Sequence, residues 1–185
     1  MRIIAGEARG RRIEAPEGLE TRPTLDRVRE NLFNMLQNRV RDARVLDLFA
    51  GSGALSLEAL SRGAAAAVLT DISARAHRVE KKNVETLGFG DRARVIQCDW
   101  HRAVSLLREE DARFDLIFLD PPYDSGLVEK ALDQIIAFDI LREGGIIICE
   151  TRSNVVLPEV PEPYYRAREY RYGKVKLTTY GRKGT

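Results

Sequence analysis

An apolar run over residues 114–119 leads directly into Asp120-Pro121-Pro122-Tyr123. Two consecutive prolines offer no N–H and fix φ, so the chain must leave a sheet abruptly at Asp120. A carboxylate, bare backbone carbonyls and an aromatic ring then lie at the carboxyl end of a strand, where open α/β sheets bind ligands. A carboxylate and a carbonyl can accept both hydrogens of an exocyclic amine while the ring stacks on its base. These residues are suited to methylating an amino group on a nucleobase.

A glycine-containing turn follows another buried run, at residues 45–49, and leads into a predicted helix over 54–61. Its glycines let the backbone approach a ligand, and the helix offers free N–H groups to an anion. Ser56 stands where a dinucleotide fingerprint has its third glycine, and such turns serve NAD, flavin and S-adenosylmethionine (SAM) alike. The candidate cofactor residues here are Asp47, Phe49, Ala50, Gly51, Ser52 and Gly53.

Two further predicted strands are followed by aspartates. Asp71, with Ile72 after it, comes twenty residues beyond Gly51 and suits the two hydroxyls of a ribose. Asp99 can accept the adenine amino group, with Trp100 beside the ring.

The charge of Asp47 favours SAM over a dinucleotide. A carboxylate repels a pyrophosphate but can hold the ammonium of a methionine moiety. The alternative is that these aspartates only cap helices, although Ser73 and His101 are placed for that task.

Strands and helices alternate from residue 44 onward, which predicts an α/β fold with a mostly parallel sheet and helices on both faces. The predicted strands are 45–49, 66–70, 94–98, 114–119 and 146–150, and the predicted helices are 54–61, 74–87, 101–109 and 126–138. Segments 165–170 and 174–180 flank Gly173 and predict a closing antiparallel hairpin.

The amino-terminal segment has a different pattern. Residues 2–13 predict a small hairpin with an arginine-rich tip at Arg9, Arg11 and Arg12. Thr24 is placed to be the N-cap of a helix over 25–38. We therefore divide the chain into a basic extension, residues 1–40, and a catalytic domain, residues 41–185.

Charge is distributed unevenly along the 185 residues. Residues 1–44 hold 10 basic and 7 acidic side chains, residues 45–163 hold 13 and 20, and residues 164–185 hold 7 and 1. Basic ends attract polyanions through counterion release, although they could also be an ordinary solvated surface. Two isolated cysteines, no metal-type spacing and no long apolar run predict a cytoplasmic protein without a metal or a membrane span.

With these motifs placed, the chain resembles the Rossmann-like class I SAM-dependent methyltransferases, and more narrowly the RsmD family. The narrower resemblance rests on residues 2–11, on residues 22–34 (Arg-Pro-Thr-Leu-Asp-Arg-Val-Arg-Glu-Asn-Leu-Phe-Asn) and on the Asp-Pro-Pro-Tyr site. It implies a seven-stranded sheet and methyl transfer from SAM to N2 of a guanine in small-subunit (16S) ribosomal RNA. It also implies that the glycine turn, Asp71, Asp99 and Trp100 line the cofactor pocket, with Asp120 between cofactor and base.

The resemblance implies that the first helix faces the mouth of the active site and that ribosomal RNA is the partner. We expect a monomer acting on a small-subunit assembly particle. The candidate RNA-binding residues are Arg9, Arg11, Arg12, Arg22, Thr24, Arg27 and Arg29. Any one of these arginines could equally lie on an ordinary solvated face.

Other readings of the same motifs stay open. An amino-methylase acting on adenine N6 in DNA or RNA, or on a protein glutamine, would use the same Asp-Pro-Pro-Tyr site, and only the first forty residues argue against it. A non-catalytic RNA- or SAM-binding protein would have no need for an amine-accepting site. A nicotinamide oxidoreductase is disfavoured because Asp47 is poorly placed for a pyrophosphate.

Overall fold

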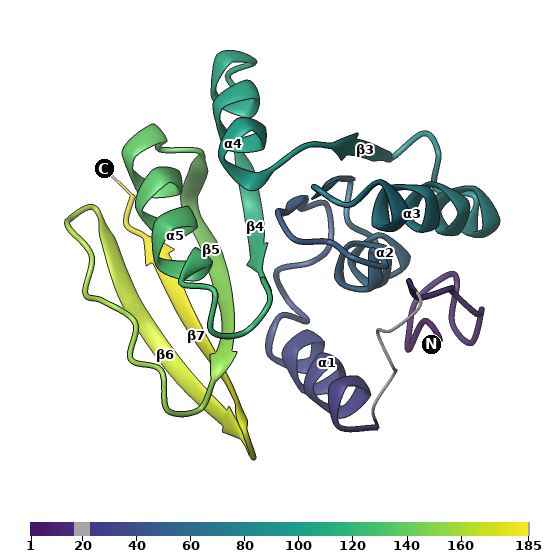
Figure 1. The fold of residues 1–185 in the computed structure, drawn as a ribbon, viewed down its shortest axis with the longest axis horizontal. Coiled ribbons are helices and arrows are strands. Elements are labelled where there is room, and N and C mark those ends of the chain that lie inside the picture. The colour runs from purple at the N-terminus through teal and green to yellow at the C-terminus, as the bar shows by residue number, and fades with distance from the viewer. Residues whose placement is uncertain (17–22, 185) are drawn as a thin grey trace.

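Seven strands form one mixed sheet in the computed structural model, which describes residues 1–16 and 23–184 (Figure 1). The helices and strands of this part of the chain are α1 (Pro23–Met35), β1 (Arg44–Asp47), α2 (Ala54–Ser61), β2 (Ala66–Asp71), α3 (Ala74–Leu87), β3 (Ala93–Gln97), α4 (Trp100–Glu109), β4 (Phe114–Leu119), α5 (Leu127–Phe138), β5 (Leu141–Arg152), β6 (Tyr164–Tyr172) and β7 (Val175–Arg182). None of these helices combines the length and apolar character needed to span a membrane.

The strand order is β3-β2-β1-β4-β5-β7-β6. Strands β1 to β5 pair in parallel, whereas β7 runs antiparallel between β5 and β6. The order reverses between β1 and β4, which is the point where open α/β sheets form their ligand crevice. The predicted mostly parallel sheet with a carboxyl-terminal antiparallel hairpin is confirmed, and it places the ends of β1 and β4 side by side.

The apolar residues of the strands alternate between two buried clusters because neighbouring side chains in a strand point to opposite faces. In β4, Leu116 and Phe118 pack with residues of α1, α2 and α3, whereas Ile117 and Leu119 pack with residues of α4 and α5. Helices therefore cover both faces, as predicted. Because α1 shares its cluster with α2 and α3, its buried residues belong to the main core.

The amino-terminal segment turns back on itself as predicted, but it does not form two strands. Its arms share one isolated bridge, between Arg2 and Arg12. The segment instead docks on the carboxyl-terminal end of α2. Gly6 has φ +82°, and a Cβ there would lie 1.8 Å from the carbonyl oxygen of Ser61, so this close approach requires glycine.

Several predicted helix ends were wrong. Helix α1 begins at Pro23, so Thr24 lies in its first turn and is not the N-cap; proline at the first helical position needs no N–H. The N-cap of α4 is Asp99, not His101, because the Asp99 carboxylate accepts a hydrogen bond from the Arg102 N–H at 3.1 Å. Ser73 caps α3 as predicted.

Candidate active site

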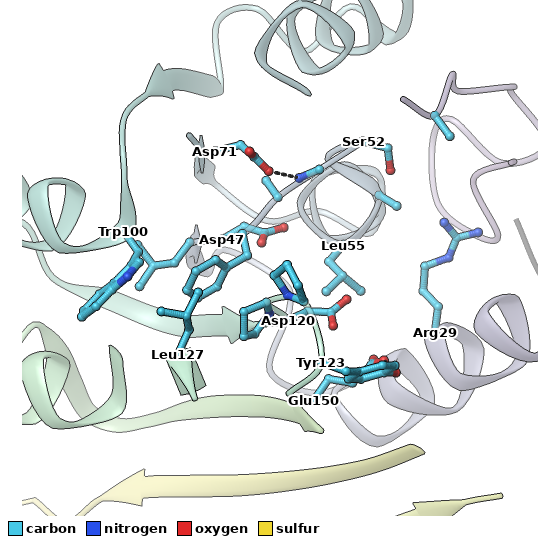
Figure 2. A pocket seen from close by; sticks show the side chains of 18 of the residues that line it. Arg29, Asp47, Ser52, Leu55, Asp71, Trp100, Asp120, Tyr123, Leu127 and Glu150 are labelled. Atoms are coloured by element: carbon cyan, nitrogen blue, oxygen red, sulfur yellow. Dashed lines mark hydrogen bonds between the residues drawn. The ribbon is translucent and has the colours of Figure 1, made fainter. Parts of the chain in front are cut away.

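Carboxylates stand at, just before or just beyond the carboxyl ends of all five parallel strands. They are Asp47, Asp71, Asp99, Asp120 and Glu150, and they line one pocket of about 760 Å³ (Figure 2). That volume suits a ligand of cofactor size. The parallel sheet brings these side chains together because its strands all end at one edge.

The glycine turn wraps the end of β1 and is held by Asp71. Gly53 is the N-cap of α2 with φ +77°, and a Cβ there would lie 2.8 Å from a Leu69 methyl carbon. The Asp71 carboxylate accepts hydrogen bonds from the Gly51 N–H at 3.0 Å and the Ser73 N–H at 2.8 Å. Each carboxylate oxygen keeps a further lone pair, so Asp71 can also accept hydrogen bonds from ribose hydroxyls.

Asp47 is fully buried beneath the turn. One of its carboxylate oxygens accepts a hydrogen bond from the Ser56 hydroxyl at 3.2 Å, and the other has no partner among the described residues. Burial raises the pKa of Asp47 to about 7, because a low-dielectric site disfavours the charged form. An ammonium group at the free oxygen would donate a hydrogen bond to that oxygen and would balance the negative charge of the carboxylate.

One end of the pocket is apolar. Figure 2 shows Trp100 and Leu127 together at the end away from Arg29, and Ile72 also lines the pocket. Asp99 precedes Trp100 in the chain and lines the same pocket; its carboxylate uses one oxygen for the N-cap of α4, which leaves its other oxygen for a ligand amine. This end fits a flat, apolar ring that carries an amino group.

Asp120, Tyr123 and Glu150 form a second polar group at this edge of the sheet. The Tyr123 hydroxyl donates a hydrogen bond to Glu150 at 2.8 Å, and the Arg152 guanidinium lies 5.1 Å from the centre of the Tyr123 ring. Burial, followed by the charge of Glu150, raises the pKa of Asp120, and burial raises the pKa of Glu150. Two neighbouring carboxylates of this kind favour hydrogen-bond donors and positive charge between them.

The pocket brings together most of the predicted site residues. Those that line it are Asp47, Phe49, Ala50, Gly51, Ser52, Asp71, Ile72, Asp99, Trp100, Asp120, Pro121, Pro122, Tyr123 and Arg29. Gly53 lies behind the turn as the cap of α2. The sequence interpretation missed Glu150, Leu55 and Leu127. The signal for Glu150 was present, because this glutamate follows the apolar run 146–149 just as the predicted aspartates follow the apolar runs of their own strands.

The predicted RNA-binding arginines are scattered. Arg9 and Arg12 are exposed on the amino-terminal segment, whereas the Arg11 guanidinium donates to backbone carbonyls at the end of α3. Arg27 lines a second groove of about 480 Å³ beside α1, which shares Asp26 and the buried Arg29 with the main pocket. Arg22 lies outside the described residues, as does the side chain of Thr24.

Comparison with known proteins adds independent evidence. A family model described as "Conserved hypothetical protein 95" matches residues 1–181. The putative rRNA methyltransferase YlbH of Bacillus subtilis is 38% identical over all of both chains. Ribosomal RNA small subunit methyltransferase D of Escherichia coli (strain K12) is 40% identical over 98% of this chain and 90% of its own. The solved structure of the putative methyltransferase yhhF from Escherichia coli superposes with a TM-score of 0.87 at 35% identity, over 100% of this chain and 99% of that one.

Proposed function

The chain belongs to the RsmD family of SAM-dependent methyltransferases, whose family model spans nearly its full length, and we propose that it methylates the N2 amine of a guanine in small-subunit ribosomal RNA. One observation carries the proposal: Asp120 and Tyr123 line the same pocket as Asp47 and Asp71. An amine acceptor and a stacking ring therefore adjoin a site with the groups that the cofactor needs. The names of the curated relatives support rRNA as the substrate class.

The pocket residues fit SAM. The free oxygen of Asp47 would hold the ammonium, Asp71 the ribose hydroxyls, and Asp99 with Trp100 the adenine. When bound, SAM supplies an electrophilic methyl group on a positively charged sulfur. The acidic lining of the pocket favours that charge.

Asp120 and the Pro121 carbonyl would accept the two hydrogens of guanine N2. That amine is a poor nucleophile because its lone pair is delocalised into the ring, and two acceptors favour a tetrahedral nitrogen whose lone pair is available. Tyr123, fixed by Glu150, would stack on the base and hold it in line. Most of the rate enhancement then comes from positioning and electrostatics. The amine needs no prior deprotonation, since methylation itself makes its proton acidic.

The target base must lie in an RNA loop or be flipped out of its stack to reach this pocket. We propose a monomer that acts in the cytoplasm on a small-subunit assembly particle. The basic extension, residues 1–40, and the basic carboxyl-terminal hairpin would contact phosphates around the target.

The deciding experiment is transfer of labelled methyl from SAM to ribosomal RNA and to small-subunit particles from cells that lack this enzyme, followed by nucleoside analysis. Label in N2-methylguanosine at one site supports the proposal. Label in N6-methyladenosine would keep the chemistry but overturn the choice of base. SAM binding without label in any nucleic acid would refute an RNA substrate.

The affinity for SAM should depend on pH through Asp47. The SAM ammonium pairs with the ionised carboxylate, whose pKa is about 7 in the free protein. Affinity should therefore fall about tenfold for each pH unit below that value, because binding must then displace a proton. Calorimetric titrations from about pH 5.5 to about pH 7.5 would measure this, below the usual pKa of an α-amino group.

Asp47→Asn provides the control for that pH dependence. It should bind SAM weakly, with an affinity that changes little over the same range. This variant keeps Glu80, a buried residue of α3 whose pKa is raised to about 8 by burial, so any pH dependence that comes from Glu80 would remain. If the variant keeps the full pH dependence, a different group is responsible.

Reversing the charges of Arg9 and Arg12 should weaken RNA binding and flatten its salt dependence. Both side chains are exposed. Each phosphate contact contributes about 0.7–0.9 to the slope of log affinity against log salt, so the slope should fall by at least about 1.4. Filter binding of ribosomal RNA at several salt concentrations would measure it, with Arg108→Glu on α4 as the matched control. An unchanged slope would assign these arginines to an ordinary solvated surface.

A further inference from the structure

The charge pattern of the pocket is strongly one-sided. Among the described residues that line it, six have acidic side chains and Arg29 has the only basic one. The acidic residues are Asp26, Asp47, Asp71, Asp99, Asp120 and Glu150. A single buried guanidinium among so many carboxylates requires an explanation, because a charged group is costly to bury without partners.

Arg29 is only 6% exposed and uses one of its three nitrogens. Its Nη2 donates to the Arg2 carbonyl at 2.6 Å and to Asp26 at 3.1 Å. Its Nε and Nη1 are buried and have no partner among the described residues. Nε–H and the Nη1 amino group lie on different sides of the guanidinium, so each can donate to its own acceptor, and Nη1 has two hydrogens to offer to a carboxylate oxygen.

We propose that Arg29 binds the α-carboxylate of SAM, and thus belongs to the cofactor site instead of the RNA-binding surface. Figure 2 shows Arg29 at the end of the pocket away from Trp100, with Asp47 between them in the view. An adenine beside Trp100 would direct the methionine moiety toward Arg29. Asp47 and Arg29 then hold the two opposite charges of one amino-acid group.

The acidic lining argues against an RNA phosphate as the partner of Arg29. Six carboxylates would repel a phosphate brought to this depth. SAM carries its carboxylate together with an ammonium and a sulfonium, so its net charge suits the same pocket. This inference rests on the part of the proposed function that places SAM in the pocket, and it is independent of the RNA target.

Helix α1 fixes the guanidinium in place before the cofactor binds. Arg29 lies next to Val28 and three residues before Leu32, both of which are buried in the core. The contacts to Arg2 and Asp26 hold Nη2 and leave the Nε and Nη1 donors for a ligand. The amino-terminal segment thereby becomes part of the cofactor site.

The test compares calorimetric affinities for SAM and for decarboxylated SAM, which differ by the carboxylate alone, in the wild-type protein and in Arg29→Met. We expect the variant to lose about 10- to 100-fold in SAM affinity and to lose much less for decarboxylated SAM. The ratio of the two affinities should therefore fall at least about tenfold. Because both ligands bind the same folded fraction, this ratio stays meaningful even if the variant is less stable. Arg41→Gln, an exposed arginine after α1, is the control for loss of charge.

Two results would overturn the assignment of Arg29. An equal loss of affinity for both ligands would show that Arg29 only shapes the pocket. If Arg29→Met binds both SAM and decarboxylated SAM as the wild-type protein does but binds RNA more weakly, Arg29 belongs to the RNA-binding surface. Failure of the wild-type protein to bind SAM at all would instead contradict the proposed function, so the two failures are distinguishable.

Discussion

Asp120→Asn should lower the single-turnover rate of methyl transfer by about 10³-fold or more, while SAM affinity changes by less than about threefold. Asparagine keeps the size of the side chain and one acceptor oxygen. It removes the negative charge that would face the amine as positive charge develops on its nitrogen. Its NH₂ group would also direct donors toward an amine that needs acceptors. Rapid-quench assays with labelled SAM and calorimetry would measure the two quantities.

Asp133→Asn is the matched control, because it makes the same chemical change on the exposed face of α5. Its rate should stay within about twofold of the wild-type rate. A rate near wild type in Asp120→Asn would remove Asp120 from the reaction. A loss of SAM affinity as large as the loss of rate would place its main role in cofactor binding.

The arrangement of the sheet could be predicted because its signals are local and strong. A strand with an apolar run such as residues 114–119 has apolar side chains on both faces, so both faces of its sheet must be buried. Strands that alternate with helices along the chain predict parallel pairing, as found for β4 with β1 and β5. The acidic residues at the strand ends could also be predicted, because their signal is local. A run of buried residues that ends in a carboxylate marks the edge of the sheet.

Element ends were less predictable because tertiary contacts decide them. Strand β5 begins at Leu141, well before the predicted residue 146, and includes Gly144 and Gly145. Their sequence does not indicate a strand, but Leu141 pairs with Phe114 across an irregularity in the register. The partner strand, not local propensity, extends β5.

The position of Arg29 was interpreted from its residue type and not from its place on the helix. It stands four residues after Leu25 and four before Phe33, within the apolar stripe of α1. An arginine in that stripe is expected to be buried and to require a partner. The missed Glu150 is a similar case, since its place directly after the apolar run 146–149 was more informative than its charge.

Glu58→Ala should lower the free energy of unfolding by about 3–5 kcal/mol, since it removes the buried anion from a group of donors. Glu58 is fully buried on α2. Its carboxylate accepts hydrogen bonds from the backbone N–H groups of Ile4 and Ala5, at 2.7 Å and 3.0 Å, and from Arg62 at 2.7 Å. Alanine would leave these donors unsatisfied in the interior. Urea denaturation would measure the change.

A second consequence follows from the place of Glu58 beneath the amino-terminal segment. The segment supplies the Arg2 carbonyl that holds Arg29, so its release should also weaken SAM binding in the folded fraction. Glu7→Ala is the control within that segment, because the Glu7 side chain forms an ion pair with Arg92 at the surface, and the substitution keeps the backbone N–H that donates to the Ser61 carbonyl. Its loss should cost about 0–1 kcal/mol. Equal destabilisation by the two variants would mean that the segment is held by its surface contacts and not by the buried carboxylate.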